Sequence, residues 1–426
     1  MARYLTAIAV LFVIAFAATA DRSAGGPHPS GAVLHLLTWI EGPDGVGDPG
    51  PDLPPAQFAP YVNFALLAAG GGELKNYGAA GITTVLYSEP NHYLPHAKMK
   101  IDQLFTMGDV ADDCAGAKVL WNKPGMPQTW VTDVRMPHVA QAWAESVALT
   151  VQQNGPPNIV FEDSSDAPYW YASPAPPCDP HTRQTVTPQV WSAATEVMES
   201  KVGYPVLFNG LMNGSSKKVP DGLLLVNGPA IGGLAELCYG SDQYDQGIHK
   251  NNDVAWQISE TTEITFALAH KLFVCHNNET TDGSVPAALD ARMYQLSSFL
   301  LTYDLSTSVY GSKWAVGPSN TKVQPEEQFV PVNPEVAEPA TIGVLLGADG
   351  NYHRRYADCY MSGVDRGRCD VIVNSSKNVT NGIAEEFTIG HGLVLQGSGI
   401  FDGGTASIVS GTLTSLAPTE SAIVFP

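Results

Sequence analysis

Short apolar runs alternate with longer amphipathic segments between about residues 32 and 310. A short apolar run between polar residues is typical of a strand buried on both faces, as in a parallel sheet. The clearest runs cover residues 32–40, 82–87, 158–161, 204–208, 233–237 and 271–275. Residues 138–152 and 187–201 carry apolar side chains at helical spacing. Alternating strands and helices predict parallel βαβ units.

Two architectures contain such units, an open doubly wound sheet and a closed barrel. Nucleotide-binding open sheets carry a glycine-rich phosphate loop, but no Gly-x-Gly-x-x-Gly follows an early strand here and no P-loop occurs. The glycines at 70–72 lack that pattern and indicate a turn. We therefore predict an α/β fold in which residues 30–316 form a TIM-type (β/α)8 barrel, although the runs mark only part of its strands.

The composition changes after Trp314. Residues 317–339 carry prolines among acidic residues, which predicts a connector laid over the surface. Residues 340–426 hold short β-rich runs separated by turn residues, without a helical pattern. The runs cover residues 341–346, 369–374, 392–396 and 412–416. This pattern predicts a small antiparallel β-sandwich domain.

The amino-terminal residues have the pattern of an export signal. Arg3 precedes an apolar stretch over residues 5–16, and the small residues at 18–20 are typical of a cleavage site. The stretch is short for a membrane span, and no later run replaces it. We expect residues 1–20 to be a signal peptide and the mature protein to be soluble, secreted and extracellular.

Six cysteines follow this segment, and an even number in an exported chain permits three disulfides. Cys359 and Cys369 flank a glycine-containing turn, so we predict a bond between them. The pairing of the other four is left open, with the last two near neighbouring predicted strands: Cys114, Cys178, Cys238 and Cys275. Four sequons are glycosylation acceptors if the host glycosylates the protein: Asn213, Asn278, Asn374 and Asn378.

Acidic residues outnumber basic ones by 42 to 22, which gives a formal charge of −20. Nucleic acids need a basic surface, and anionic membranes repel an acidic chain, so the charge argues against both partners. No Cys-x-x-Cys spacing is present, so a zinc knuckle is not expected. We expect no metal and no cofactor. The oligomeric state is left open, with a monomer favoured.

Two apolar runs end in carboxylates. The run at 159–161 leads into Glu162 and Asp163, and the run at 233–235 leads into Glu236. The carboxyl ends of barrel strands face the active site, and two acids at that rim suit glycoside hydrolysis, one as proton donor and one as nucleophile or base. The alternatives are acids that cap the next helix or, for Glu236, pair with a buried arginine. Side chains alternate along a strand, so Glu162 and Asp163 point to opposite sides.

Further residues near predicted strand ends are candidates for sugar contacts. Aromatic rings suit the apolar face of a sugar, and Glu41 and Asn209 suit its hydroxyls. Each candidate has a structural alternative, namely core-edge packing, a solvated side chain or an ordinary turn. The candidates are Trp39, Glu41, Tyr87, Asn209, Tyr169, Trp170 and Tyr239. Glu89 and His92 follow the second run, where His92 suits a hydroxyl or is simply exposed. Asp133 is expected to cap a helix beginning near Pro137.

The order Asp133-Val-Arg-Met-Pro137, Ile159-Val-Phe-Glu-Asp163 and the strand ending at Glu236 resembles a family of glycoside-hydrolase-like (β/α)8-barrel proteins with a carboxyl-terminal β-sandwich. Leu296-Ser-Ser-Phe-Leu-Leu301 is similar to their last helix. Gly350-x-Tyr-x-Arg354 with Val371-Ile-Val-Asn374 is similar to their sandwich motif. Glu162 replaces an apolar residue of the family pattern, and a cysteine-containing insertion interrupts the sandwich motif. The resemblance implies Asp163 as nucleophile or base and Glu236 as proton donor, with Glu162 in a supporting position.

These features predict an exported glycoside hydrolase that acts on a neutral or weakly charged polysaccharide or oligosaccharide. One rival is a non-catalytic carbohydrate-binding barrel, and another is a lyase or transglycosidase using the same carboxylates. A Ser-His-Asp hydrolase is disfavoured because no Gly-x-Ser-x-Gly elbow occurs, and a zinc protease because His-Glu-x-x-His is missing.

Overall fold

The structure of the protein is a computed structural model. It describes residues 37–40, 54–67, 73–93, 104–121, 129–165, 172–173, 176–211, 221–236, 238–239, 253–277, 286–312, 323–376, 378–381, 390–396, 404–411 and 413–426. The expected signal peptide and the sequons at Asn213 and Asn278 lie outside the described residues.

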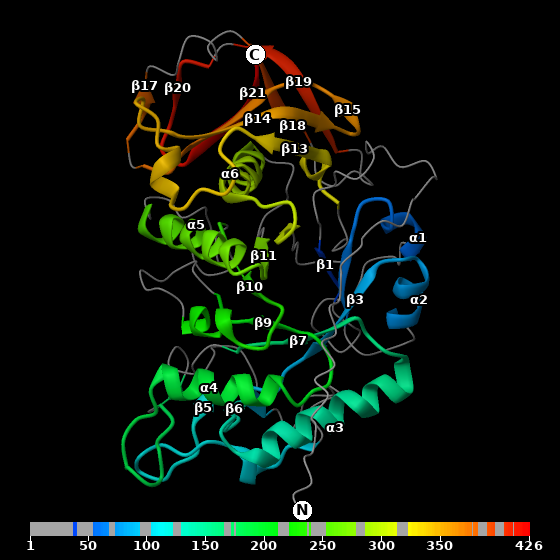
Figure 1. The fold of residues 1–426 in the computed structure, drawn as a ribbon, viewed down its shortest axis with the longest axis vertical. Coiled ribbons are helices and arrows are strands. Elements are labelled where there is room, and N and C mark those ends of the chain that lie inside the picture. Colours follow the sequence, from blue (N-terminus) through cyan, green and yellow to red (C-terminus); the bar gives the residue numbers. More distant parts are fainter. Residues whose placement is uncertain are drawn as a thin grey trace, which may run out of the picture.

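Eight parallel strands form the centre of the molecule and confirm the predicted barrel (Figure 1). In spatial order they are β1 (Leu37–Ile40), β2 (Phe64–Leu67), β3 (Thr83–Ser88), β7 (Ile159–Glu162), β9 (Val206–Asn209), β10 (Gly232–Glu236), β11 (Leu272–Asn277) and β12 (Ser308–Ser312). β12 also lies against β1, so the sheet curls round on itself. The sequence pattern located six of these strands and missed β2 and β12.

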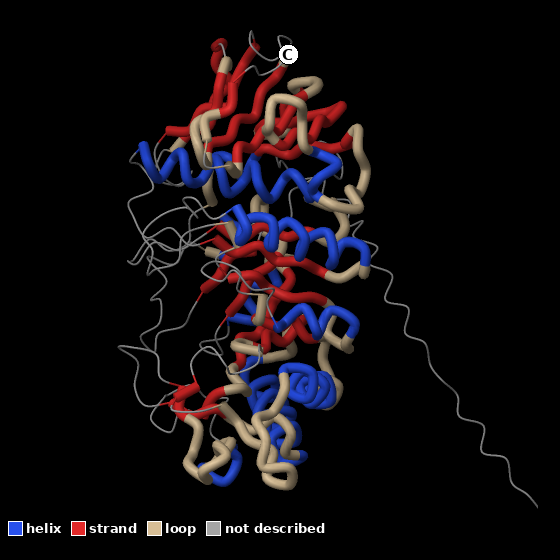
Figure 2. The backbone as a smooth tube through the Cα atoms, turned by 90° about the vertical axis from the view of Figure 1, so that its left-hand side faces the viewer, coloured by secondary structure: helices blue, strands red, loops and turns tan. Residues whose placement is uncertain are grey.

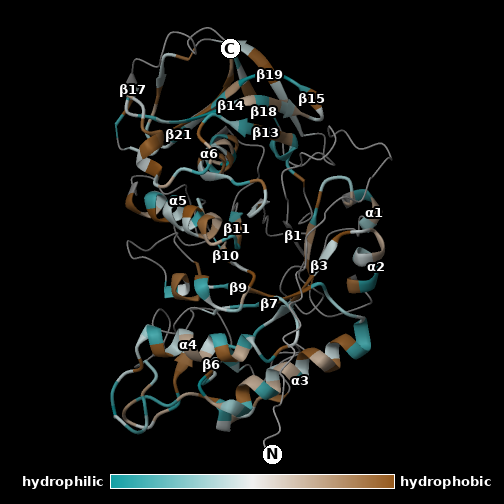
Figure 3. Cartoon of the chain, in the orientation of Figure 1, coloured by the Kyte–Doolittle hydropathy of each residue, from teal (hydrophilic) through white to brown (hydrophobic). Residues whose placement is uncertain are grey.

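Helices follow the strands and pack around the barrel. They are α1 (Pro55–Phe58), α2 (Glu73–Ala79), α3 (Pro137–Asn154), α4 (Pro188–Glu199), α5 (Asp253–Leu268) and α6 (Pro286–Thr302), with a 3-10 helix η3 (Asp221–Asn227) before β10. The two helices predicted from apolar spacing are α3 and α4, which bury one face and expose the other. Both carry hydrophobic and hydrophilic residues along their length (Figure 3). Pro137 opens α3 as expected. The capping prediction for Asp133 is wrong, because Met136 is the N-cap and Asp133 accepts hydrogen bonds from Arg135.

Alternation along the strands divides the apolar side chains between two cores. One set fills the barrel interior: Leu66, Val85, Ile159, Phe161, Leu207, Leu234, Val274 and Val309. The other set faces outward and packs against the helices. β10 packs tightly against its neighbours, since a Cβ on Gly233 would lie 2.7 Å from the Phe208 ring. Phe161 and Leu234 define which side of β7 and β10 faces the barrel interior.

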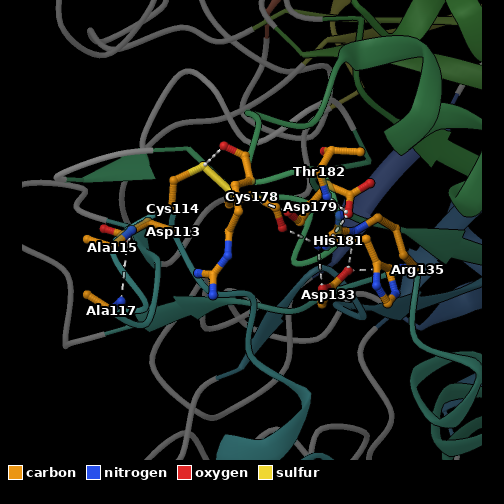
Figure 4. Close-up of a disulfide and its surroundings, with 11 residues drawn as sticks. Asp113, Cys114, Ala115, Ala117, Asp133, Arg135, Cys178, Asp179, His181 and Thr182 are labelled. Atoms are coloured by element: carbon orange, nitrogen blue, oxygen red, sulfur yellow. Dashed lines mark hydrogen bonds and ion pairs between the residues drawn. A yellow bond between two sulfur atoms is a disulfide. The ribbon is translucent and has the colours of Figure 1, made fainter.

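A four-stranded antiparallel sheet is built from the loops that follow β3 and β7. We call it the insert sheet; it comprises β4 (His92–Tyr93), β6 (Thr129–Val131), β5 (Leu120–Trp121) and β8 (Ala172–Ser173) in that order. A 3-10 helix η2 (Met107–Asp109) precedes β5. A disulfide between Cys114 and Cys178, with Cα atoms 4.9 Å apart, ties the two loops together (Figure 4).

The carboxyl-terminal part is antiparallel, as predicted. Its larger sheet has the order β13 (Phe329–Pro334), β14 (Tyr352–Met361), β16 (Cys369–Asn374), β21 (Glu420–Phe425), β18 (Gly390–Gln396) and β19 (Thr405–Gly411), with β15 (Val364–Asp365) beside β14. The smaller sheet pairs β17 (Thr380–Asn381) with β20 (Ser415–Leu416).

Two boundary predictions need correction. The expected connector contains the 3-10 helix η4 (Pro325–Gln328) and β13, which pairs with β14, so the antiparallel sheet begins before residue 340. Residues 341–346, expected as a strand, contain the 3-10 helix η5 (Ile342–Leu345). Proline is compatible with both η4 and β13. The first residue of a helical turn does not need a backbone N–H, and an edge strand leaves some of its backbone N–H groups unpaired.

Helix α6 lies between the barrel and the carboxyl-terminal sheet (Figure 2). The Arg354 guanidinium of β14 donates to the Leu301 and Tyr303 carbonyls at 3.1 and 2.8 Å, and the Tyr356 hydroxyl donates to the Leu300 carbonyl. Carbonyls in the last turn of a helix lack intrahelical donors. The carboxyl-terminal sheet therefore caps α6 and holds it against the barrel.

The remaining cysteines are paired. Cys359 and Cys369 are bonded with Cα atoms 6.0 Å apart, which confirms the predicted bridge. Cys238 is bonded to Cys275 of β11, with Cα atoms 5.3 Å apart. The sequon at Asn374 is not a usable acceptor in this fold, because its side chain is fully buried and donates to the carbonyls of Asn378, Leu416 and Ala417. Among the described residues, no helix is both long and apolar enough to cross a membrane.

Candidate active site

Five polar side chains follow one another round the barrel at the carboxyl ends of adjacent strands. Tyr87 belongs to β3, Asp163 follows β7, Asn209 ends β9, Glu236 ends β10 and His276 belongs to β11. Their positions alternate in phase with the residues of the interior core, such as Val85, Phe161 and Leu234. They therefore form one polar layer above an apolar barrel core, on the rim where barrel active sites lie.

Asp163 is held by donors from three directions. The Tyr87 hydroxyl donates to its Oδ2 at 2.6 Å, and Asn209 Nδ2 and the Ser164 backbone amide donate to its Oδ1 at 2.7 and 2.8 Å. The carboxylate is half-buried. These bonds fix its orientation while the side chain keeps an exposed portion.

A single amide joins Asp163 to Glu236. Asn209 Nδ2 lies 2.7 Å from Asp163 Oδ1 and 3.1 Å from Glu236 Oε2, and Asn209 itself is 4 % exposed. Because both oxygens contact the same nitrogen, Asp163 Oδ1 and Glu236 Oε2 lie no more than about 5.8 Å apart. Two acids that are 73 positions apart in the sequence thus form one pair, since residues 163 and 236 end strands separated only by β9.

Glu162 and Asp163 lie on opposite sides of the strand, as alternation predicts, and Glu162 is the one that points away from the barrel interior. It is completely buried and accepts a hydrogen bond at 3.0 Å from Asn91 Nδ2, which also donates to the Asp163 carbonyl at 2.8 Å. Burial raises the pKa of Glu162 to about 7. It also contacts Glu199 at the end of α4, where burial and the Glu162 charge raise the pKa to about 10. The pair therefore holds a proton at neutral pH.

The structure places the other predicted sugar-contact residues in different environments. Tyr87 and Asn209 lie in the polar layer, and Trp39 belongs to β1. Glu41, Tyr169 and Trp170 lie outside the described residues. The prediction for Tyr239 is wrong.

Tyr239 is fully buried, so its ring cannot stack on a sugar in this structure. Its backbone amide donates to Asn277 Oδ1 at 2.8 Å, and its hydroxyl reaches Glu263 Oε2 at 3.4 Å. Burial raises the pKa of its hydroxyl well above the usual value. The chain after β10 passes beneath α5, where an aromatic residue fills the core between strand and helix.

Sequence reasoning missed the position of His276. It is the register partner of Glu236 on the neighbouring strand and is 3 % exposed. The apolar run before His276 predicted a strand. Only the pairing of β10 with β11 places its imidazole beside the Glu236 carboxylate. Residues directly opposite on parallel strands share one face of the sheet.

The fold and the polar layer define a (β/α)8-barrel protein with a paired-carboxylate centre at the carboxyl-end rim. No family model matches the sequence, and no curated protein matches it either. Solved structures are similar at low identity. A GH27 β-L-arabinopyranosidase from Geobacillus stearothermophilus, in complex with arabinose, is 10% identical with a TM-score of 0.45, over 92% of this chain and 97% of that one.

Two further structures are similar to a comparable degree. A GH36 α-galactosidase, AgaA from Geobacillus stearothermophilus, is 11% identical with a TM-score of 0.40, over 92% of this chain and 55% of that one. Ega3 from Aspergillus fumigatus, in complex with galactosamine, is 10% identical with a TM-score of 0.41, over 66% and 92%.

Proposed function

We propose that this protein is a glycoside hydrolase that cleaves O-glycosidic bonds of a polysaccharide or oligosaccharide with Asp163 and Glu236. The observation that carries the proposal is the Asn209 amide within hydrogen-bonding distance of both carboxylates. Retaining enzymes place their two carboxyl groups about 5–5.5 Å apart and inverting enzymes about 6.5–9.5 Å. The facing oxygens of the two carboxyls lie no more than about 5.8 Å apart, which is compatible with the spacing of retaining enzymes.

In the proposed reaction Asp163 attacks the anomeric carbon while Glu236 donates a proton to the leaving oxygen. The glycosidic bond breaks, and a covalent glycosyl ester forms at Asp163. Glu236, now ionised, then takes a proton from water, which attacks the same carbon and releases Asp163. Tyr87 and Asn209 hold the nucleophile in place, and Asn209 also contacts the acid.

The described contacts suit this division of roles. Asp163 already accepts three hydrogen bonds, which hold a carboxylate ready to attack along one direction. Glu236 accepts the longer of the two bonds from the Asn209 amide and lies next to His276 on β11. Neighbouring groups of this kind set the protonation of a catalytic acid.

The test is a turnover screen with both anomers of 4-nitrophenyl glycosides and with plant, fungal and bacterial polysaccharides. On whichever substrate the wild type cleaves, Asp163→Asn and Glu236→Gln should each lower kcat by several orders of magnitude with folding intact. Glu145→Gln, on α3 and away from the polar layer, is the matched control and should keep full activity. Sugar binding without turnover would identify a carbohydrate-binding barrel, and unsaturated products would identify a lyase.

We also propose that the protein is exported and acts outside the cell. Three disulfides link the described cysteines, and such bonds persist in oxidising compartments. The amino-terminal pattern of Arg3 and an apolar stretch agrees with export. Amino-terminal sequencing of the protein from culture medium tests this proposal, with a start near residue 21 expected.

A further inference from the structure

A chain of contacts leads from Asp163 to the insert sheet. The next residue, Ser164, donates from its hydroxyl to Glu89 Oε2 at 3.4 Å. Glu89 Oε1 lies 3.4 Å from His92 Nδ1, and the His92 ring stacks on Trp121 with centroids 4.2 Å apart and an interplanar angle of 26°. Three side chains from β4, β5 and the end of β3 therefore meet directly beside the candidate nucleophile.

The backbone at Ser164 is unusual. Its φ is 56°, in the left-handed region that side chains other than glycine adopt at a cost. Such conformations persist where surrounding contacts hold them, and they are enriched at ligand sites. Here the left-handed turn directs the Ser164 hydroxyl toward Glu89, one residue beyond Asp163.

Pairing in the insert sheet gives Trp121 and Trp130 opposite faces. Trp121 is opposite Thr129, and the neighbouring Val131 is opposite His92, so these residues share one face. Thr129 and Val131 are buried, which shows that this face is turned toward the body of the protein.

Trp130 lies on the other face. It is opposite Tyr93 on one side and Leu120 on the other, and its ring centroid is 6.1 Å from that of Tyr93. The insert sheet therefore presents one half-buried tryptophan toward the Glu89 side and another away from it.

The insert sheet, which carries Trp121, is cross-linked. β5 pairs with β8, so strands from the loops after β3 and β7 form one sheet, and the Cys114–Cys178 disulfide joins the same two loops. Arg135 donates to the Cys178 carbonyl at 3.0 Å and pairs with Asp133 (Figure 4). An insert sheet that is cross-linked in this way is preorganised, which lowers the entropic cost of binding a ligand.

We propose that Trp121, held in place by His92 and Glu89, forms a stacking subsite for one pyranose unit of the substrate, next to the unit attacked by Asp163. This inference rests on the proposed function and deepens it. Trp121 offers a rigid, amphipathic ring for the CH face of the sugar. Glu89 and His92 are each 5 % exposed, so they position the half-buried Trp121 ring and do not themselves contact the sugar. His92 links the two residues, because its Nδ1 contacts Glu89 Oε1 and its ring stacks on Trp121.

The experiment measures binding by isothermal titration calorimetry, so that it does not depend on turnover. The ligands are cellohexaose, chitohexaose, maltohexaose, laminarihexaose, mannohexaose and xylohexaose at millimolar concentration. The full chain is used with its disulfides intact, as wild type and with Asp163→Asn to prevent cleavage. Trp121→Ala and Glu89→Gln are added to each. Trp130→Ala is the matched control, since it removes the same side chain from the opposite face of the same sheet.

For a hexasaccharide that the protein binds, Trp121→Ala should weaken affinity by about tenfold or more, the loss expected when a stacked ring is removed. Glu89→Gln should weaken it as well, and Trp130→Ala should leave it unchanged. Thermal unfolding of the two tryptophan variants checks that both fold.

Several outcomes would overturn the subsite. They are equal losses in the two tryptophan variants, unchanged affinity in Trp121→Ala, and no binding of any hexasaccharide to the wild type. Binding that depends on Trp121 in a protein without turnover would instead refute the proposed hydrolysis and leave the subsite standing.

Discussion

Replacement of Glu199 by glutamine should make the protein more stable at neutral pH. Glu199 is 3 % exposed and faces the fully buried Glu162. Two carboxyl groups share a hydrogen bond only when one of them carries a proton. Glutamine has nearly the same shape and donates an N–H to Glu162 without taking a proton from solution.

The magnitude follows from proton linkage. The pKa of Glu199 is 4.5 for an ordinary, solvated glutamate and about 10 in the folded protein, raised first by burial and then by the Glu162 charge. Between these values the folded protein binds one more proton than the unfolded chain, so the free energy of unfolding falls as pH rises. The slope is about 1.4 kcal/mol per pH unit, or about 3 kcal/mol between pH 5 and pH 7.

The same reasoning gives the sign for both carboxyls. A raised folded pKa provides stability that is fully present below pH 4.5 and is lost as pH rises through the folded value. Glu162 contributes in the same direction up to about pH 7. Glu199→Gln removes the loss of stability that comes from Glu199. The difference in unfolding free energy between this variant and the wild type should therefore grow with pH.

The assay is urea unfolding followed by tryptophan fluorescence at pH 5, 6, 7 and 8. The difference in unfolding free energy between Glu199→Gln and wild type should rise by about 1.4 kcal/mol per pH unit. Glu145→Gln on α3 should differ from wild type by less than about 0.5 kcal/mol at every pH. A difference that does not change with pH would refute the reasoning, because Glu199 would then titrate alike in both states.

Three further predictions concern the site and the domain junction. Glu162→Gln should reduce kcat far less than Asp163→Asn, and the reverse result in steady-state kinetics would exchange their roles. Tyr87→Phe should lower kcat by about 10- to 100-fold in steady-state kinetics, because it removes one donor that orients the nucleophile. Arg354→Met should lower stability by about 3 kcal/mol in urea unfolding, since it leaves the last carbonyls of α6 without donors; a loss below about 0.5 kcal/mol would contradict the cap.

Much of the fold could be predicted because its signals are local. Buried strands such as β7 and β10 appear as apolar runs, and α3 and α4 appear as apolar spacing with a helix start at Pro137 or Thr187. β2 and β12 were missed. β2 has four residues inside a longer apolar stretch, and β12 contains serines and a glycine, so neither differs enough from its surroundings to be located.

The candidate site was predicted only in part. Asp163 and Glu236 were located because each ends an apolar run, and alternation correctly separated Asp163 from Glu162. Tyr239 was misplaced because the sequence does not show that α5 covers the chain after β10.

By itself, the sequence determined the type of the elements with a clear local pattern and showed that Glu162 and Asp163 occupy opposite faces of a strand, because periodicity is recorded in neighbouring residues. Only the tertiary structure decided which side chains meet. Asn209 joins two carboxylates, Glu199 faces the buried Glu162, and Trp121 reaches Glu89 through His92. Each of these contacts joins residues on different strands, helices or loops. Such contacts depend on strand register and on the crossing of loops in space, which no local pattern of residues encodes.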